Sequence, residues 1–537
     1  MTIVNLKLNH DYLSDFSNSS FGALDHTVYL SLADNAVPGI PRHVLAKMPG
    51  VKTMDIGRGR IQSLSAADFK NTPKLQHIVL PGNRISILES HSLPNILKHL
   101  HIGRNLLTTL NGTLRDMSEL EWLFINQNRL TNLDGQLPQN ENKLTLIHAS
   151  NNLLEKLPQD LKNLQRIESL FFQQNLINSL DGAVSKSRRL KRLQLTSNRI
   201  RTLAENEFLE TEMLQDLQLG HNFITSLNNS LLPLRSLRCV NLTHNLLTEF
   251  SLQEIRGLPM LSIVDVSYNR ISKLGGRMEN LVEWEIRVME LRLEHNELKS
   301  LDGSLNGLHG LLRLNLSHNR LTNIAPDDLI GLEDLRMLDV SHNKLTTLEE
   351  TSKTFLPRLE ELIASHNSIT MLERDFHGLP MLCWADLSNN QIRSLGRDLV
   401  AKTRCRVHNI PGILKIYLQD NPILCDDELP EIISAMEVNH TRIHGVSDCT
   451  PEPEIHETPI VNPVYATLTN INTPPPPTLV HFGISDNQIR NPTNMEAVHE
   501  VKVLPLQPVA SLVEQPVTLE KSANLVVENA GIDNVTP

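Results

Sequence analysis

The stretch Leu311-Leu-Arg-Leu314-Asn-Leu316-Ser-His-Asn319-Arg-Leu321 follows the pattern LxxLxLxxNxL, and this pattern decides how the chain folds. Two weaker copies begin at Ile3 and Val51 and carry Asp11 and Gly59 in the ninth position, where the other copies have Asn. That Asn recurs at residues 35, 83, 105, 128, 152, 175, 198, 222, 245, 269, 296, 319, 343, 367, 390 and 421. The sequence predicts 18 rungs, which begin at residues 3, 27, 51, 75, 97, 120, 144, 167, 190, 214, 237, 261, 288, 311, 335, 359, 382 and 413.

The repeat predicts a solenoid on physical grounds. In each LxL segment two apolar side chains point inward and the middle one points outward, because strand side chains alternate. Each rung adds a short strand to a parallel sheet, and stacking buries apolar faces that a single rung leaves exposed. We expect the Asn amides to bond loop backbone groups of adjacent rungs, since buried peptide groups need partners. A core spine on the convex side is expected from Phe21, Phe69, Phe208 and Phe376.

The form LxxLxLxxNxLxxLxxxxFxxLxx resembles the typical leucine-rich repeats of extracellular animal proteins, such as Toll-type receptor ectodomains, Slit, chaoptin and connectin. The resemblance covers residues 3 to about 449. It implies an α/β solenoid, a leucine-rich-repeat horseshoe of about 18 rungs with a parallel concave β-sheet. Such repeats specify a fold well and a function poorly. The expected organisation is a repeat array at 1–424, a C-terminal cap at 425–449 and a proline-rich disordered tail at 450–537.

The C-terminal cap is expected from two segments. Asn421-Pro-Ile-Leu-Cys425 resembles the opening of a cysteine-flanked cap, and Cys449-Thr-Pro resembles its close. The resemblance implies a Cys425–Cys449 disulfide, which would stabilise by on the order of 3 kcal/mol. Residues 427–436 suit a short helix that covers the last rung. Cys405 is an alternative partner, whereas Cys239 and Cys383 lie six rungs apart and are expected to be free thiols.

The two ends of the chain differ from the array. Residues 1–13 lack the features of a signal peptide, and the first repeat starts without a cap, so we expect an incomplete N-terminus. Residues 450–537 contain 13 prolines and two aromatic residues, a composition that cannot bury enough apolar surface to fold. Within this tail, residues 462–465 read NPVY, an adaptor-binding pattern that we interpret as a chance match.

Composition argues against several classes of function. A net charge of −11 argues against nucleic acid as the main partner, because neutralising phosphates requires a basic surface. No apolar run is long enough for a transmembrane helix. Nucleophile elbows, phosphate loops, HExxH and CxxC motifs are absent from the sequence, so we expect no enzyme and no cofactor.

A histidine precedes the consensus Asn in six rungs. Zinc needs ligands that converge on one point, whereas a ladder spreads them along a line, so we predict no metal site. A second interpretation is pH sensitivity, because adjacent imidazolium groups would repel below about pH 6. The six residues are His221, His244, His295, His318, His342 and His366.

The sequons favour an extracellular or cell-surface location. Asn241 and Asn315 belong to sequons that the repeat itself generates on strands. Four further sequons lie outside strand cores and are expected glycosylation sites: Asn18, Asn111, Asn228 and Asn439. The cysteine-flanked cap supports the same location, and the alternative is cytoplasmic.

The outward positions of the strands predict where a partner binds. Rungs 5 to 8 place aromatic and histidine side chains on the concave face, while the C-terminal half is mixed in charge. Exposed apolar patches and Trp residues favour interaction sites. The alternative is that these rings only pack on one another across strands. The expected contacts are His99, His101, Trp122, Phe124, His148 and Phe171.

The leading hypothesis is therefore a non-enzymatic protein-binding scaffold for extracellular recognition or adhesion. An innate-immune recognition protein and an intracellular adaptor with a signalling tail are the alternatives. The partner is expected to be another protein or an extracellular ligand, and a homodimer is left open.

Overall fold

The computed structural model describes residues 3–14, 21–139, 142–275, 287–306, 308–349, 353–407, 410–446 and 450–451. Asn18, Cys449 and the predicted tail beyond residue 451 lie outside the described residues.

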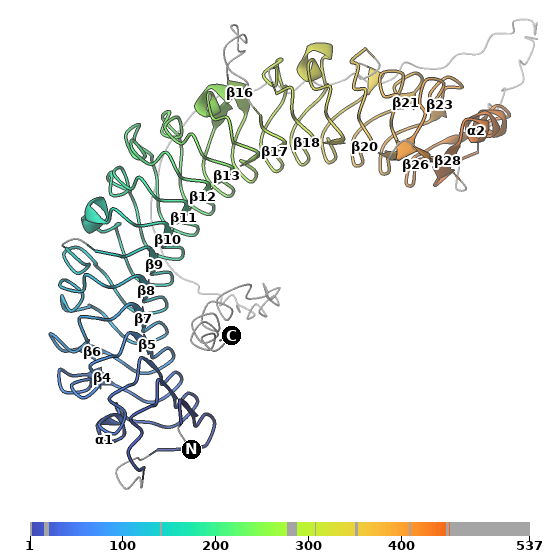
Figure 1. The fold of residues 1–537 in the computed structure, drawn as a ribbon. Coiled ribbons are helices and arrows are strands. Elements are labelled where there is room, and N and C mark those ends of the chain that lie inside the picture. Colours follow the sequence, from blue (N-terminus) through green and yellow to red (C-terminus); the bar gives the residue numbers. More distant parts are fainter. Residues whose placement is uncertain are drawn as a thin grey trace, which may run out of the picture. The chain divides into compact units, whose positions relative to one another are not determined.

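Parallel strands stack rung on rung along the inner side of an arc (Figure 1), as the repeat predicts. Each strand pairs in register with the strand of the next rung, so equivalent positions of neighbouring repeats lie side by side. All 18 predicted rungs contribute a strand to the main sheet, and the cap adds one more, which gives this sheet 19 strands among the described residues. These strands are β1 (Asn5–Lys7), β2 (Tyr29–Ser31), β3 (Thr53–Asp55), β5 (His77–Val79), β7 (His99–His101), β8 (Trp122–Phe124), β9 (Leu146–His148), β10 (Ser169–Phe171), β11 (Arg192–Gln194), β12 (Asp216–Gln218), β13 (Cys239–Asn241), β15 (Ile263–Asp265), β17 (Glu290–Arg292), β18 (Arg313–Asn315), β19 (Met337–Asp339), β20 (Glu361–Ile363), β22 (Trp384–Asp386), β26 (Leu414–Tyr417) and β28 (Thr441–His444).

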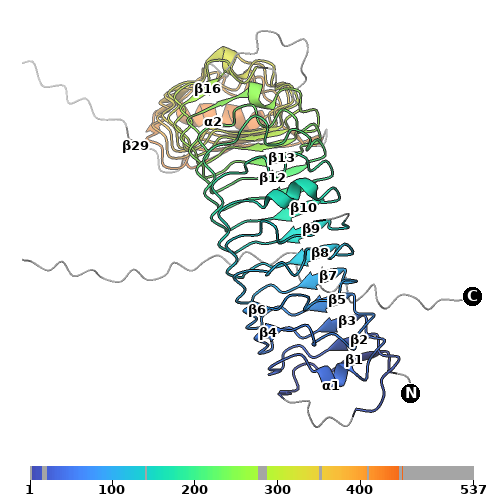
Figure 2. The same ribbon diagram turned by 90° about the vertical axis from the view of Figure 1, so that its left-hand side faces the viewer.

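The other side of each rung consists of turns and short elements (Figure 2). Short strands pair between neighbouring rungs here, and one antiparallel pair lies in the long rung 17. The helical turns are α1 (Arg42–Leu45), η1 (Gln159–Asn163), η2 (Leu252–Ile255) and η3 (Pro326–Leu329). The strand pairs are β4 (Ser63–Leu64) with β6 (Ile87–Leu88), β14 (Glu249–Ser251) with β16 (Lys273–Gly275), β21 (Met371–Leu372) with β23 (Ser394–Leu395), β24 (Arg406–Val407) with β25 (Ile410–Pro411), and β27 (Leu424–Cys425) with β29 (Thr450–Pro451).

One continuous apolar core runs through the stacked rungs. The inward Leu, Ile and Val side chains of the strands are almost fully buried, for example Leu217 and Leu314. Phe69, Phe208 and Phe376 are buried and Phe21 is partly buried against the same core, so the predicted phenylalanine spine is confirmed as core.

The Asn ladder satisfies the loop backbone as expected. The Nδ2 group of Asn222 donates to the carbonyl oxygens of Leu195 at 3.0 Å and Leu219 at 2.9 Å. Its Oδ1 accepts from the backbone N–H of Ile200 at 3.0 Å. Each ladder Asn thus links its own turn to the preceding rung. The residue before it adopts a left-handed conformation, as His221 does with φ 53°.

A short helix covers the C-terminal end of the array. α2 (Leu429–Val438) places Leu429, Ile432 and Met436 in the core, which agrees with the predicted lid. β28 follows α2 and extends the main sheet beyond β26. The last rung therefore has an apolar cover and an additional strand.

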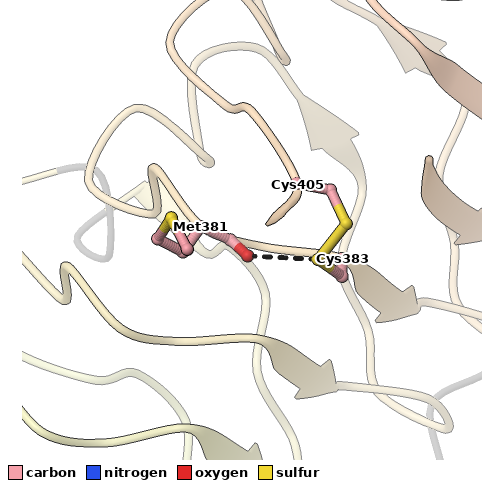
Figure 3. Close-up of a disulfide and its surroundings, with 3 residues drawn as sticks. All are labelled: Met381, Cys383 and Cys405. Carbon is pink, nitrogen blue, oxygen red and sulfur yellow. Dashed lines mark hydrogen bonds between the residues drawn. A yellow bond between two sulfur atoms is a disulfide. The ribbon is translucent and has the colours of Figure 1, made fainter. Parts of the chain in front are cut away.

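One disulfide of the structure was not predicted from the sequence. Cys383, expected to be free, forms a disulfide with Cys405, and their Cα atoms are 4.7 Å apart (Figure 3). The long rung 17 folds Cys405 back beside the strand that Cys383 precedes, so the prediction for Cys383 was wrong. Cys239 is a free thiol, as predicted. Cys425 is also disulfide-bonded, and the pairing of β27 with β29 brings its segment beside residues 450–451. Its predicted bond to Cys449 stays a prediction.

Candidate functional site

Seven aromatic and histidine side chains form two rows on the concave face across β5 to β10. We call this set the aromatic cluster. The in-register strands place residues of equivalent repeat positions in line, which explains both rows. The first row contains His77, His99 and Trp122, and the second contains His101, Phe124, His148 and Phe171.

The first row is tightly stacked. The rings of His99 and Trp122 lie 4.0 Å apart between centroids and only 4° from parallel. His77 meets His99 edge-on at 4.4 Å, and the two Nδ1 atoms are 2.9 Å apart, so one of them donates to the other. Leu146 extends the row on β9. The row therefore presents a fixed, preorganised set of rings.

The second row has one tilted and two edge-to-face contacts instead. His101 and Phe124 lie 5.2 Å apart, Phe124 and His148 6.0 Å, and His148 and Phe171 5.5 Å. The Nε2 atom of His148 is 2.7 Å from the hydroxyl of Ser150. Such tilted geometries are those that aromatic rings prefer, so the packing between strands is favourable in itself.

The histidines of the cluster are uncharged at neutral pH. Burial is the main cause, and it lowers the pKa of His77, His101 and His148 to about 4. For His99 the pKa falls to about 3, because burial combines with the nearby charges of His77 and Lys98. A partner would thus meet neutral rings over this part of the sheet, while the nearby ion pairs Lys98–Glu121 and Lys191–Glu168 carry the charges.

All six residues predicted from the sequence lie together in this cluster. Five of them are half-buried, and His148 is buried with only 5% of its surface exposed. The rings therefore pack against one another across the strands, and the half-buried ones also leave part of their surface exposed on the concave face.

The prediction from sequence missed two groups. His77 occupies the same repeat position as His99 one rung earlier, so its position in the repeat could have identified it. Trp384, Tyr417 and His444 form a second aromatic group at the C-terminal end, with ring centroids 4.4 Å and 4.8 Å apart. His444 belongs to the cap strand β28, whose pairing with β26 the repeat pattern does not show.

The C-terminal half of the concave face carries charges, as expected. Arg292 lies between Glu290 and Asp265, with its Nε 2.7 Å from Glu290 and its Nη1 3.4 Å from Asp265. Arg292 thus pairs with one carboxylate of its own strand, β17, and with one of β15.

A separate stack of rings runs along the edge of the array, formed by the residue before the ladder Asn in seven consecutive rungs. We call it the histidine ladder. Its centroids are 4.0 to 4.3 Å apart and its planes are within 19° of parallel. Within the described residues no group of three His, Cys, Asp or Glu side chains is arranged to hold a metal ion. The ladder contains His221, His244, Tyr268, His295, His318, His342 and His366.

Three of the four predicted glycosylation sites can be placed. Asn111 and Asn228 are exposed in left-handed turns, and Asn439 is half-exposed at the end of α2. All three lie away from the aromatic cluster in the repeat, so glycans there would leave the cluster open. Asn18 lies outside the described residues.

Comparison with known families agrees with the fold. The family model described as "Leucine rich repeat" matches residues 188–247, 212–271, 286–345 and 335–392. The array is built of leucine-rich repeats. Among the helices in the described ranges, none combines the length and hydropathy that a membrane span requires.

Curated relatives share stretches of this leucine-rich-repeat array. Human leucine-rich repeats and immunoglobulin-like domains protein 3 is 28% identical over 135 residues, which is 24% of this chain and 12% of that protein. Epiphycan from Gallus gallus is 28% identical over 124 residues, 22% of this chain and 39% of the relative. The matches thus span well under half of the relatives' own length.

Solved leucine-rich-repeat structures have the same fold. A chain of the glycosylated Toll–Spatzle complex of Drosophila superposes with a TM-score of 0.65 at 23% identity, over 80% of this chain and 62% of that one. YopM from Yersinia enterocolitica gives a TM-score of 0.54 at 21% identity, over 78% of this chain and 79% of that one. At these identities the likeness concerns the fold alone.

Proposed function

We propose that this chain is a non-enzymatic scaffold that recognises a protein partner through the aromatic cluster on its concave face. The observation that carries the proposal is the pair of ring rows over β5 to β10, which are uncharged and packed ring against ring between neighbouring strands. Rigid aromatic side chains supply large contact areas at little entropic cost, and Trp is enriched at binding hot spots.

An extracellular or cell-surface location is the setting we infer for this function. The Cys383–Cys405 disulfide supports it, since disulfides persist mainly in oxidising compartments. The exposed Asn111 and Asn228 sequons offer sites for glycans. Digestion of the native protein with an N-glycosidase should increase its electrophoretic mobility, and unchanged mobility with fully reduced cysteines would favour the cytoplasm.

A second candidate function is innate-immune recognition. The Drosophila complex with the same fold contains Toll bound to Spatzle and is described as a hub in development and innate immunity. The proposed scaffold could take either role with the same concave site, and the identity of the bound protein would decide between them.

The test uses the Trp122→Ala/Phe124→Ala double variant. A partner captured with the wild-type chain from extracellular fluid would be purified, and its dissociation constant measured for both proteins. We expect the affinity to fall by more than about tenfold, because hot-spot truncations typically cost about 2 kcal/mol or more. The melting temperature should change little, since both side chains are only half-buried.

The matched control is Trp384→Ala/Tyr417→Ala, which removes the tilted ring pair at the C-terminal end of the array. This variant should bind as the wild type does. Unchanged affinity of the Trp122→Ala/Phe124→Ala protein, or an equal loss in both variants, would contradict the assignment of the site to the aromatic cluster.

A further inference from the structure

The residues next to the ladder Asn carry a charge opposite to that of the whole chain. The chain has a net charge of −11. Yet the residues immediately before and after the ninth repeat position include nine cations and only three acids, Asp34, Glu297 and Asp420. All nine cations are exposed, and we call them the basic strip. They are Arg58, Arg60, Arg84, Arg104, Arg129, Arg199, Arg270, Arg320 and Lys344.

The backbone holds the basic strip in line. The N–H of Arg58 donates to Pro81 of the next rung, and that of Arg104 donates to Asn126. On the other side of the Asn, the N–H of Arg129 donates to Leu107 of the preceding rung. Similar bonds recur along the array. The strip therefore follows one edge of the solenoid for twelve steps, or roughly 58 Å at about 4.8 Å per strand.

Most of these charges are not neutralised by the protein. Within the described part of the chain, only Arg58, with Asp34, and Arg320, with Glu297 at 3.0 Å, form ion pairs among the nine. Arg104 donates to the amide of Gln127, which carries no charge. A partner with negative charges would therefore meet cations that are available for binding.

The N-terminal end of the strip is hollowed. Arg58, Arg60 and Arg84 line a hollow of about 390 Å³, together with Asp34 and Tyr12. Guanidinium groups match sulfate and carboxylate groups with paired N–H donors. Arg58 is already paired with Asp34, so Arg60 and Arg84 are the two guanidinium groups of this hollow that form no ion pair within the described residues, and together they suit an anionic group larger than a single ion.

The histidine ladder occupies the same edge in the C-terminal half. Its rings are stacked face to face, so their faces are covered by neighbouring rings and only their edges reach solvent. Between the two end rings, His221 and His366, the histidines offer ring nitrogens and no open face on which a nucleic-acid base could stack, which stacking recognition requires. A polymer without aromatic groups fits this edge better than a nucleic acid does.

We propose that the basic strip and the histidine ladder form a binding edge for a linear anionic polysaccharide of the sulfated type. A strip one or two residues wide that follows a curved edge for roughly 58 Å suits an extended polymer better than a folded acidic protein. The inference rests on the extracellular setting proposed above. It leaves the aromatic cluster free for a protein partner.

Acidification should strengthen this binding. Burial and neighbouring imidazoles lower the pKa of His244, His295, His318 and His342 below 6.5, so these rings gain their charge as the pH falls below that value. A bound polyanion favours the charged rings, so binding takes up protons. The charged groups bordering the ladder are Asp265, Arg292, Glu294 and Asp339 on the strand side and Arg270, Glu297, Arg320 and Lys344 on the loop side.

The experiment measures binding of the full chain to immobilised heparin oligosaccharides at about pH 7.5 and about pH 5.5 over a range of salt concentrations. Arg60→Gln/Arg84→Gln/Arg129→Gln should weaken binding on the order of tenfold at both pH values and flatten its salt dependence, because fewer counterions are released. His295→Gln/His318→Gln/His342→Gln should bind normally at the higher pH and lose the gain in affinity at the lower one.

The matched control is Lys70→Gln/Lys74→Gln/Arg235→Gln, which removes the same charge from exposed positions outside the strip. It should bind as the wild type does. Equal losses in this control and in the strip variant would overturn the proposal, as would absence of binding by the wild type at both pH values. Tighter binding of double-stranded DNA of equal charge would overturn the choice of a polysaccharide.

The Trp122→Ala/Phe124→Ala variant separates this inference from the proposed function. It should keep full heparin affinity while losing its protein partner. If heparin binding depends on the basic strip but no protein partner depends on the aromatic cluster, the proposed function is wrong and the polysaccharide-binding edge remains supported. If a protein partner depends on the aromatic cluster but heparin binding does not depend on the basic strip, only the polysaccharide-binding edge is rejected.

Discussion

At the scale of single residues, the ladder Asn does the most to fix the turns. Its side chain is buried, and it replaces hydrogen bonds that the tight turn cannot make with its own backbone. In Asn222 the amide serves four backbone groups, of Leu195, Leu219, Gly220 and Ile200. A buried group without a partner costs about 1–3 kcal/mol, so each Asn matters more than its size suggests.

Asn222→Ala should therefore lower the free energy of unfolding by roughly 3 kcal/mol, because several buried carbonyl and N–H groups lose their partner. Chemical denaturation measures the effect. Asn163→Ala, at an exposed position, is the control and should change stability by less than about 0.5 kcal/mol. Equal stability of the two variants would show that water replaces the ladder amide.

The cluster histidines link stability to pH at the same scale. His101 has a folded-state pKa of about 4, lowered mainly by burial, against an ordinary value of 6.5. Below pH 6.5 the unfolded chain therefore takes up protons that the folded chain does not, and folding becomes less favourable as the pH falls. Buried carboxyl groups with a raised pKa, such as Asp55 and Asp375, act in the opposite direction.

We predict that His101→Phe reduces the acid sensitivity of folding. The melting temperature of the wild type should fall relative to that of the variant as the pH is lowered from about 6.5 toward about 4. The carboxyl groups are the same in both proteins, so their contribution cancels when the two melting temperatures are subtracted. His43→Gln, at an exposed histidine, should follow the wild type. A constant difference across this range would contradict a lowered pKa at His101.

At the scale of elements, the disulfide holds the long rung 17. The extra residues of this rung form the β24–β25 pair, and the Cys383–Cys405 bond ties the segment to the start of β22. A cross-link over a separation of 22 residues restricts the unfolded chain. The expected stabilisation for a loop of this size is about 3 kcal/mol.

Cys383→Ser/Cys405→Ser should accordingly lower the free energy of unfolding by about 3 kcal/mol. Hydrogen exchange should accelerate first around β22 and β26, because the rung loses its tether to the neighbouring strand. Cys239→Ser, at the free thiol, serves as the control and should leave stability nearly unchanged. If exchange rose evenly over the whole array, the bond would not act locally.

At the scale of the whole molecule, stability is a sum of contacts between neighbouring rungs. Each rung of a solenoid touches only the rungs beside it, so an end rung has fewer contacts than a middle one. β1 pairs only with β2 among the described strands, and Leu6 is partly buried there, whereas Leu217 at the same position of β12 is fully buried. Identical sequence positions therefore differ in energy.

Leu217→Ala should lower the free energy of unfolding by about 3–4 kcal/mol, the range for buried leucines, whereas Leu6→Ala should lower it by less than half as much. Thermal and chemical unfolding of both variants provide the measurement. The pair shares residue type and repeat position, so each is the other's control. Equal losses would mean that the first rung is as tightly covered as the tenth.

The amino-acid sequence alone determined the repeat architecture. Alternation in the LxL segments and the recurrent Asn were enough to place all 18 rungs, because the same local pattern meets the same neighbour in every rung. The outward positions identified six residues of the aromatic cluster for the same reason. In a parallel in-register sheet, residues at the same repeat position of adjacent rungs lie side by side.

The tertiary structure decided what the repeat does not encode. The Cys383–Cys405 bond depends on the path of an irregular insertion, and no period predicts how such a segment folds back. The burial of His148 and the lowered pKa values depend on how side chains of adjacent rungs fill the space between them. The basic strip is scattered in the sequence at intervals of one or more rungs, and only stacking brings its charges onto one edge.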